Sequence, residues 1–259
     1  MSSSGKATAQ EPKYSPLKPS GRNICPTDLR SLRYTSHMAY VIAVGNLKGG
    51  TGKTTIAVNV ACALAQKYRV CLIDADTQHA ATDWTEAGHA AVTARPLPVA
   101  PGPGKDDAAH LRAWAEKVMK LRRACDVLVI DLPPHFESST AATLAIADIL
   151  AVPVTPGGAE IAATKRAKSV IDRARATRPE RPIDCVLVPN RVDRRTAAGK
   201  ALNHRLSDIG ETVGPALRQR AAHMDAYAAG TWIGASAPNS EAHDELMALV
   251  KFLRRRLGL

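Results

Sequence analysis

The sequence has few aromatic residues and no long apolar run. Phe, Trp and Tyr together make up 4% of the 259 residues, so a hydrophobic core must be built mainly from aliphatic side chains. No apolar stretch approaches the roughly 18 residues that a membrane-spanning helix needs. The sequence therefore predicts no transmembrane segment.

Cysteine is also scarce, and its spacing is irregular. The five cysteines stand at positions 25, 62, 71, 125 and 185, without the C-x-x-C spacing that is typical of zinc sites. Their number is odd and no signal peptide precedes them, so we expect reduced thiols in a cytoplasmic protein. All but the first lie in or beside apolar runs, where cysteine behaves as a small buried residue.

Acidic residues are too few to balance the basic ones, and the excess is unevenly placed. The net charge is +11, and residues 165–259 alone contain 18 Lys and Arg against 10 Asp and Glu. Residues 38–164 are almost neutral, at −1. A basic region attracts nucleic acid or anionic lipid. A solvated arginine-rich surface without any partner would give the same pattern.

The clearest motif is a glycine-rich loop between a predicted strand (40–44) and an alanine-rich predicted helix (56–66). Glycines let backbone N–H groups surround phosphate oxygens, and the helix N-terminus adds positive potential. Lys53 would reach the β- and γ-phosphates of a nucleotide, and the Thr54 hydroxyl would bind Mg²⁺. The predicted nucleotide-binding residues are Lys48, Gly49, Gly50, Thr51, Gly52, Lys53, Thr54 and Thr55.

Two later apolar runs end in carboxylates. One run leads into Asp74 and Asp76, which share a face of an extended chain, and the other leads into Asp131, which two prolines follow closely. Ligands bind at the carboxyl ends of parallel strands, so we expect all three side chains near the nucleotide. Asp131 is expected to bind Mg²⁺ through water.

The loop departs from the general phosphate-binding pattern, because Leu47 replaces its first glycine and Lys48 adds a second lysine. It resembles the deviant Walker A loop of the ParA/MinD family of ATPases, above all the small partition ATPases without an N-terminal helix-turn-helix domain. The resemblance implies that Lys48 crosses a dimer interface to the partner's phosphates. It also implies that Asp76 orients or activates the attacking water and that Asp74 supports the Mg²⁺ shell, although Thr77 replaces the family's proline here.

The order of the motifs predicts an α/β fold with one doubly wound, mostly parallel sheet flanked by helices. Residues 38–259 are expected to form the ATPase domain, and residues 1–37, rich in Ser, Pro, Lys and Gly, a flexible tail. Met38 directly precedes the first strand, so a native tail and a true start at Met38 both stay open. Residues 94–107 are expected to be a proline- and glycine-rich connection.

Three further features concern the middle of the chain. Asn190 follows a predicted strand in a segment that resembles the base-reading element of related NTPases, where it would bind adenine, although asparagine is also a common turn residue. His135 is more typical of a solvent-facing loop histidine than of a general base, and residues 135–142 are expected to sense the γ-phosphate. A predicted helix over 160–176 carries five cations: Lys165, Arg166, Lys168, Arg173 and Arg175.

The C-terminal third supplies the candidate DNA contacts. Contacts between cationic side chains and phosphates give affinity without reading the base sequence. The last predicted helix also has an apolar stripe at positions 246, 249, 250, 253 and 257, and the cations at its end suit the helix dipole as well. The candidates are Arg194, Arg195, Lys200, Arg218, Arg220, Arg254, Arg255 and Arg256.

The resemblance implies a slow ATPase that uses Mg²⁺ and converts ATP and water to ADP and phosphate. ATP would close a homodimer that binds nonspecific DNA on the nucleoid, and a ParB-like or other small adaptor would stimulate hydrolysis. The cargo would be a plasmid, a chromosome or a protein assembly such as a carboxysome. One alternative is a MinD-like membrane-associated positioning ATPase that inserts residues 246–259 into lipid. Another is a metabolic ATP-dependent ligase on the same fold, against which Lys48 argues.

Overall fold

The computed structural model describes residues 38–98, 107–134 and 142–259. Several sequence predictions therefore lie outside the described residues. They are the tail over 1–37 with Cys25, the middle of the proline-rich connection, His135, and all but the last residue of the expected γ-phosphate sensor.

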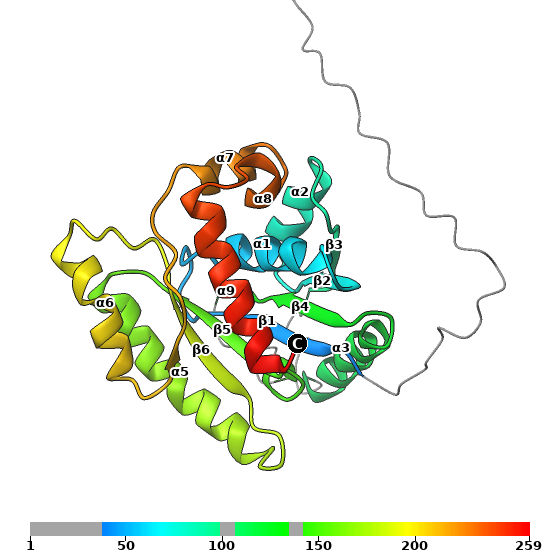
Figure 1. Cartoon of the computed structure of the whole chain (residues 1–259). Helices are drawn as coiled ribbons and strands as arrows, with labels where there is room; N and C mark the ends of the chain where they lie inside the picture. The colour runs from blue at the N-terminus through cyan, green and yellow to red at the C-terminus, as the bar shows by residue number, and fades with distance from the viewer. Residues whose placement is uncertain (1–37, 99–106, 135–141) are drawn as a thin grey trace, which may run out of the picture. The chain divides into compact units, whose positions relative to one another are not determined.

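Most strands of the described part of the chain are each followed by a helix, and three helices close it (Figure 1). The strands are β1 (Tyr40–Val44), β2 (Val70–Asp74), β3 (Ala94–Pro96), β4 (Val127–Asp131), β5 (Ile149–Val154), β6 (Asp184–Pro189) and β7 (Thr212–Val213). The helices are α1 (Lys53–Ala65), α2 (Ala80–Glu86), α3 (Asp107–Arg122), α5 (Gly158–Ala176), α6 (Ala197–Ser207), α7 (Ala222–Ala228), α8 (Ile233–Ser236) and α9 (Glu241–Leu257).

The described strands form one parallel sheet in the order β3-β2-β4-β1-β5-β6-β7. This confirms the predicted single, mainly parallel sheet. Val44 and Asp74 are both in register with Asp131, so the central strands β1, β2 and β4 end at the same level. The segments that follow these strands are thereby brought together at one edge of the sheet.

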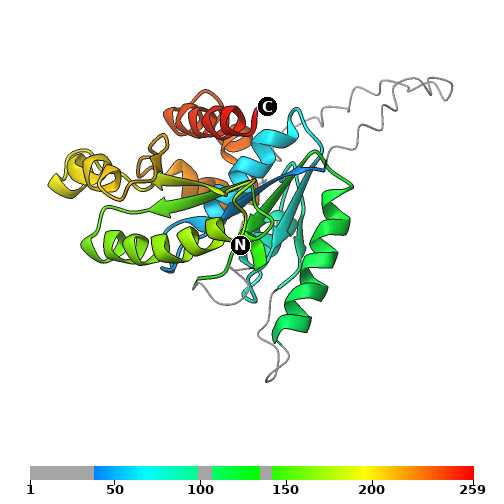
Figure 2. The ribbon, with the colours of Figure 1, turned by 90° about the horizontal axis from the view of Figure 1, so that it is seen from below.

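Both faces of the sheet are covered by helices (Figure 2). Ile42 and Val129 belong to a core with α1 and α9, whereas Val41 and Ile130 belong to a second core with α3 and α5. Successive strand residues point to opposite faces, and both faces are apolar here. That is why the strand sequences are continuous apolar runs without a polar alternation.

Helix α9 packs against α1 through its predicted apolar stripe. The stripe residues Leu246, Leu249, Val250, Leu253 and Leu257 are all between 0 and 8% exposed. The stripe is therefore part of the core, which argues against its insertion into a lipid surface. Within the described residues, no helix combines the length and the apolar character that crossing a membrane requires.

Replacing Leu253 by alanine should lower the free energy of unfolding by about 2–5 kcal/mol, because the side chain is 1% exposed and its removal leaves a cavity between α9 and α1. Urea denaturation measures this change. Met247→Ala on the same helix is the control, since Met247 is 39% exposed and its truncation should change stability by no more than about 0.5 kcal/mol. Equal losses for both variants would contradict the packing.

The prediction of a proline- and glycine-rich connection over 94–107 is wrong for residues 94–96, because they form the edge strand β3. The main-chain N–H of Ala94 donates to Thr85 Oγ1 at 2.8 Å, and Ala94 pairs with Leu72. An edge strand needs ladder partners on one side only, so it tolerates Pro96 at its end. Proline content alone therefore gave the wrong prediction.

Candidate nucleotide-binding site

The glycine-rich loop lies at the carboxyl end of β1 and leads directly into α1. Gly50 and Gly52 have φ values of +74° and +90°, a region that favours glycine. Space is also restricted at Gly52, because an added Cβ would overlap the Asn190 side chain. The Asn46 amide anchors the start of the loop by donating to the Pro153 carbonyl at 2.6 Å. The sequence thus folds into a tight loop that only glycine permits.

The two lysines of the loop have different environments. Lys53 is 7% exposed, and its Nζ donates to the Lys48 carbonyl within the same loop at 3.4 Å. Burial lowers the pKa of Lys53, an effect that the carboxylates of Asp131 and Asp76 oppose. The Lys48 side chain is 42% exposed, and its Nζ pairs with Glu160 Oε1 of α5 at 2.5 Å. Lys53 therefore faces the chain's own loop, whereas Lys48 reaches out of it.

Thr54 and Asp131, two of the predicted metal ligands, are in direct contact. The Thr54 hydroxyl donates to Asp131 Oδ2 at 2.7 Å. Burial raises the pKa of Asp131 to about 7, and the nearby charges of Asp74 and Asp76 act in the same direction. Asp131 Oδ1 has no hydrogen-bond partner among the described residues. A hydroxyl beside a free carboxylate oxygen suits Mg²⁺, which takes few protein ligands and keeps several waters.

Asp74 has a different environment from Asp131. Its side chain is fully buried, and Oδ2 accepts hydrogen bonds from the main-chain N–H and hydroxyl of Thr82 at 2.9 and 3.0 Å. Oδ1 accepts from the N–H of Asp76 at 3.1 Å. Asp74 thus fixes the turn that carries Asp76 and the start of α2, and its place near Mg²⁺ stays a prediction.

The described residues contain no dense cluster of metal-ligating side chains. No three His, Cys, Asp or Glu side chains in that part of the chain converge as a metal-binding group. Thr54 and Asp131 would hold Mg²⁺ together with phosphate oxygens and water.

A cavity of ≈ 680 Å³ lies beside the first turn of α1. The predicted base-binding residue Asn190 lines it, but its Nδ2 donates to the Thr51 carbonyl at 2.7 Å. The adenine contact predicted for Asn190 thus competes with a bond to the loop, and it stays a prediction. The lining residues are Thr55, Asn190, Arg191, Arg218, Gln219, Arg220, Ala221, His223, Met224 and Tyr227.

The structure divides most of the candidate DNA contacts between two surface hollows. The first, of ≈ 570 Å³, is lined by Arg194, Arg195, Arg218 and Arg220 among others. The second, of ≈ 650 Å³, is lined by Arg255 and Arg256 with Arg175 from α5.

Most of these candidate cations already have partners, which leaves them less available to phosphate. Arg254 Nε donates to the Tyr68 hydroxyl at 3.1 Å. Arg194, Lys200 and Arg255 have no ion pair among the described residues. The paired ones are Arg195 with Asp193 at 2.8 Å, Arg218 with Glu245 at 3.4 Å, Arg220 with Glu241 at 2.5 Å and with Glu245 at 2.7 Å, and Arg256 with Asp184 at 2.6 Å.

Comparison with known proteins decides the family. The model of the CobQ/CobB/MinD/ParA nucleotide binding domain matches residues 42–231. The chain belongs to this family. The region that matches the CobQ/CobB/MinD/ParA domain begins within β1 and ends just before α8. It therefore contains the glycine-rich loop and the side chains of Asp74, Asp76 and Asp131.

One relative agrees with this membership, and two solved structures share the fold. The maintenance of carboxysome distribution protein A of Halothiobacillus neapolitanus is 32% identical over 197 residues, which cover 75% of this chain and 87% of the relative. The ATP complex of a Cyanothece McdA variant has a similar fold, with a TM-score of 0.68 at 16% identity over 86% of this chain and 97% of that one. The Pyrococcus furiosus cell division ATPase MinD gives 0.67 at 16% identity, over 84% and 99%.

Two residues that shape the site belong to none of the sequence motifs. Glu160 holds Lys48, and Thr82 holds Asp74. Glu160 lies 112 positions from its partner, so nothing in the local sequence signals the pair. Thr82 lies eight positions after Asp74, and its spacing matches no motif.

Proposed function

We propose that this chain is an ATP-hydrolysing dimerisation switch that positions a cargo within the cell. The observation that carries this proposal is the placement of Lys48. Its side chain lies outside the loop that Lys53 fills, is 42% exposed, and pairs with Glu160 of α5. A second lysine directed away from the chain's own loop can reach the nucleotide of a second subunit once it leaves Glu160.

Each residue of the site has a defined part in this proposal. Lys53 and the N–H groups of the loop bind the phosphates, and Thr54 and Asp131 hold Mg²⁺, which neutralises phosphate charge when bound. Asp76, placed by Asp74, orients the attacking water. Lys48 leaves Glu160 and contacts the partner's phosphates, so hydrolysis requires two subunits.

The ≈ 680 Å³ cavity is our candidate for the nucleobase. Thr55 belongs to both the loop and the cavity wall, so a nucleotide with its phosphates on the loop can direct its base there. The volume is within the ~300–1,000 Å³ usual for small-molecule sites. The Asn190 amide would give up its hydrogen bond to the Thr51 carbonyl and form one with the base instead.

The dimer would bind duplex DNA without sequence preference. A ParB-like or other small adaptor would stimulate slow ATP hydrolysis, and hydrolysis would release the protein from DNA. The basic C-terminal third, with a net charge of +8, supports this part of the proposal. The name of the Halothiobacillus relative, maintenance of carboxysome distribution protein A, supports cargo positioning. The protein would then act in the cytoplasm on the nucleoid.

Duplex binding by the full chain tests this proposal. Fluorescence anisotropy with a random-sequence duplex, Mg²⁺ and a non-hydrolysable ATP analogue should give an affinity at least about tenfold above that with ADP. With six or more phosphate contacts, the affinity should fall by about a thousandfold between 50 and 200 mM salt. Equal binding with ADP, or none at 50 mM salt, would overturn it.

A further inference from the structure

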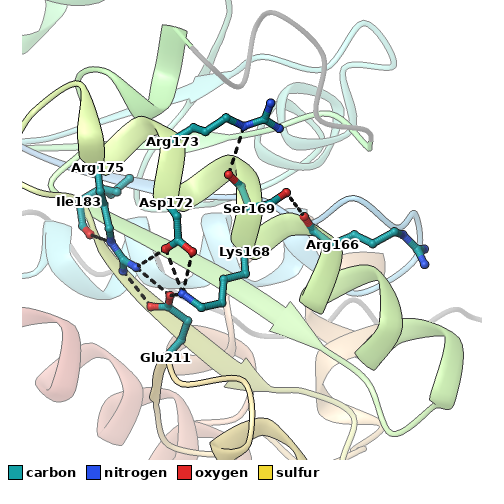
Figure 3. Close-up of polar contacts among 8 residues, drawn as sticks. All are labelled: Arg166, Lys168, Ser169, Asp172, Arg173, Arg175, Ile183 and Glu211. Carbon is teal, nitrogen blue, oxygen red and sulfur yellow. Dashed lines mark hydrogen bonds and ion pairs between the residues drawn. The ribbon is translucent and has the colours of Figure 1, made fainter.

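Helix α5 carries five cations, and the structure separates them into two groups. Figure 3 shows Arg166, Lys168, Arg173 and Arg175. Lys168 and Arg175 belong to a network with Asp172 and Glu211. Lys168 Nζ lies 2.9 Å from Asp172 and 3.2 Å from Glu211. Arg175 makes two hydrogen bonds to the Glu211 carboxylate, at 2.7 and 2.8 Å. Two carboxylates thus neutralise the two cations on this flank of α5.

The other three cations of α5, Lys165, Arg166 and Arg173, are exposed and have no ion pair among the described residues. Arg173 Nε donates to the Ser169 carbonyl at 3.2 Å, which leaves its two terminal nitrogens without a partner in the described part of the chain. Figure 3 shows the Arg166 and Arg173 side chains pointing away from the network around Glu211. We call these three residues the α5 stripe.

The spacing within the α5 stripe suits a regular line of phosphates. Arg166 and Arg173 are seven residues apart, about 10.5 Å along a helix axis. Each strand of duplex DNA carries one charge per about 3.4 Å of its axis, so this distance spans about three phosphates. Guanidinium groups on a rigid helix bind phosphate oxygens in a fork geometry.

The surroundings of the α5 stripe favour DNA over lipid or an acidic protein. The isoleucines of α5, Ile161 and Ile171, are buried in the core, so neither is available to enter a membrane. Protein partners generally need a central aromatic or apolar anchor, whereas the exposed residues between the two arginines are Ser169 and Asp172, and Asp172 is paired with Lys168. A charged surface without an apolar centre suits nonspecific binding to a polyanion.

We propose that Lys165, Arg166 and Arg173 form a binding surface for the phosphate backbone of duplex DNA. The inference rests on the proposed function and adds a contact surface to it. The cations of α5 then have two different roles. The α5 stripe binds DNA, whereas Lys168 and Arg175 hold α5 to Glu211, in the segment that precedes β7.

The test compares two triple variants of the full chain in the ATP-analogue state. One is Lys165→Ala, Arg166→Ala and Arg173→Ala. The charge-matched control is Arg112→Ala, Lys117→Ala and Lys120→Ala, three exposed cations of α3. The stripe variant should lose about tenfold or more in duplex affinity at 100 mM salt. Its slope of log affinity against log salt should fall by about 2 to 3. The control should stay within about twofold of wild type, and both variants should bind ATP normally.

The possible outcomes separate this inference from the proposed function. Absence of ATP-dependent duplex binding in the wild-type protein would overturn both. Wild-type binding that the stripe variant retains would overturn the inference alone. Equal losses in the stripe variant and the α3 control would also overturn it, because the effect would then follow total charge. Loss of binding to anionic lipid vesicles with intact duplex binding would assign the stripe to lipid instead.

Discussion

Lys53→Ala is expected to lower the affinity for ATP by at least about 100-fold. Hydrogen bonds between a charged donor and phosphate contribute about 1.5–3 kcal/mol each, and 1.4 kcal/mol corresponds to a factor of ten. Lys53 is buried inside the loop, whereas the ammonium of Lys48, the other cation of the loop, pairs with Glu160 outside it. Titration calorimetry with ATP and Mg²⁺ measures the change.

The control for Lys53→Ala is the stability of the nucleotide-free protein. Its free energy of unfolding in urea should stay within about 1 kcal/mol of the wild-type value, because burial already disfavours the charged ammonium and so lowers the pKa of Lys53. Lys53→Met, which keeps the length of the side chain, should lose ATP affinity to the same degree. Affinity within about threefold of wild type for either variant would contradict the role of Lys53.

Lys48→Ala is expected to separate nucleotide binding from dimerisation. The Lys48 ammonium lies outside its own loop, and the side chain is 42% exposed, so its loss should change ATP affinity by no more than about threefold, a difference of under about 1 kcal/mol. The ATP-dependent dimer and partner-stimulated hydrolysis should both be lost. Light scattering and phosphate release measure the two effects.

Glu160→Gln is the matched variant on the other side of the ion pair. It removes the carboxylate that holds Lys48 and keeps the shape of the side chain. A partly exposed ion pair contributes about 0.2–1 kcal/mol, and closing the dimer opens two such pairs, one in each subunit. The ATP-dependent dimer should therefore form about 2- to 30-fold more tightly. In a double variant with Lys48→Ala, Glu160→Gln should not change dimerisation any further. Weaker dimerisation in Glu160→Gln alone would show that Glu160 supports the dimer directly.

The fold and the phosphate loop could be predicted because both depend on local sequence. The apolar run before Gly45 and the glycines that follow determine a strand and a loop by backbone chemistry alone. Asp74 and Asp131 ended predicted strands, and parallel pairing brings such strand ends to one edge. The register of Asp74 with Asp131 confirms that expectation.

Contacts between distant segments could not be predicted. Nothing in the sequence indicates that Glu160 meets Lys48, or that Glu211 neutralises Lys168 and Arg175 and leaves the α5 stripe unpaired among the described residues. Charge counts treat all arginines alike. Arg220, a predicted DNA contact, pairs with two glutamates of α9, and only the packing of α9 brings them together.

The mass of the protein in solution tests the central claim most directly. Light scattering should be carried out on the full chain with Mg²⁺ and either a non-hydrolysable ATP analogue or ADP. A dimerisation switch predicts twice the mass of one chain with the ATP analogue and the mass of a single chain with ADP, and Lys48→Ala should remain at one chain in both. The same mass with both nucleotides in the wild-type protein would contradict the account.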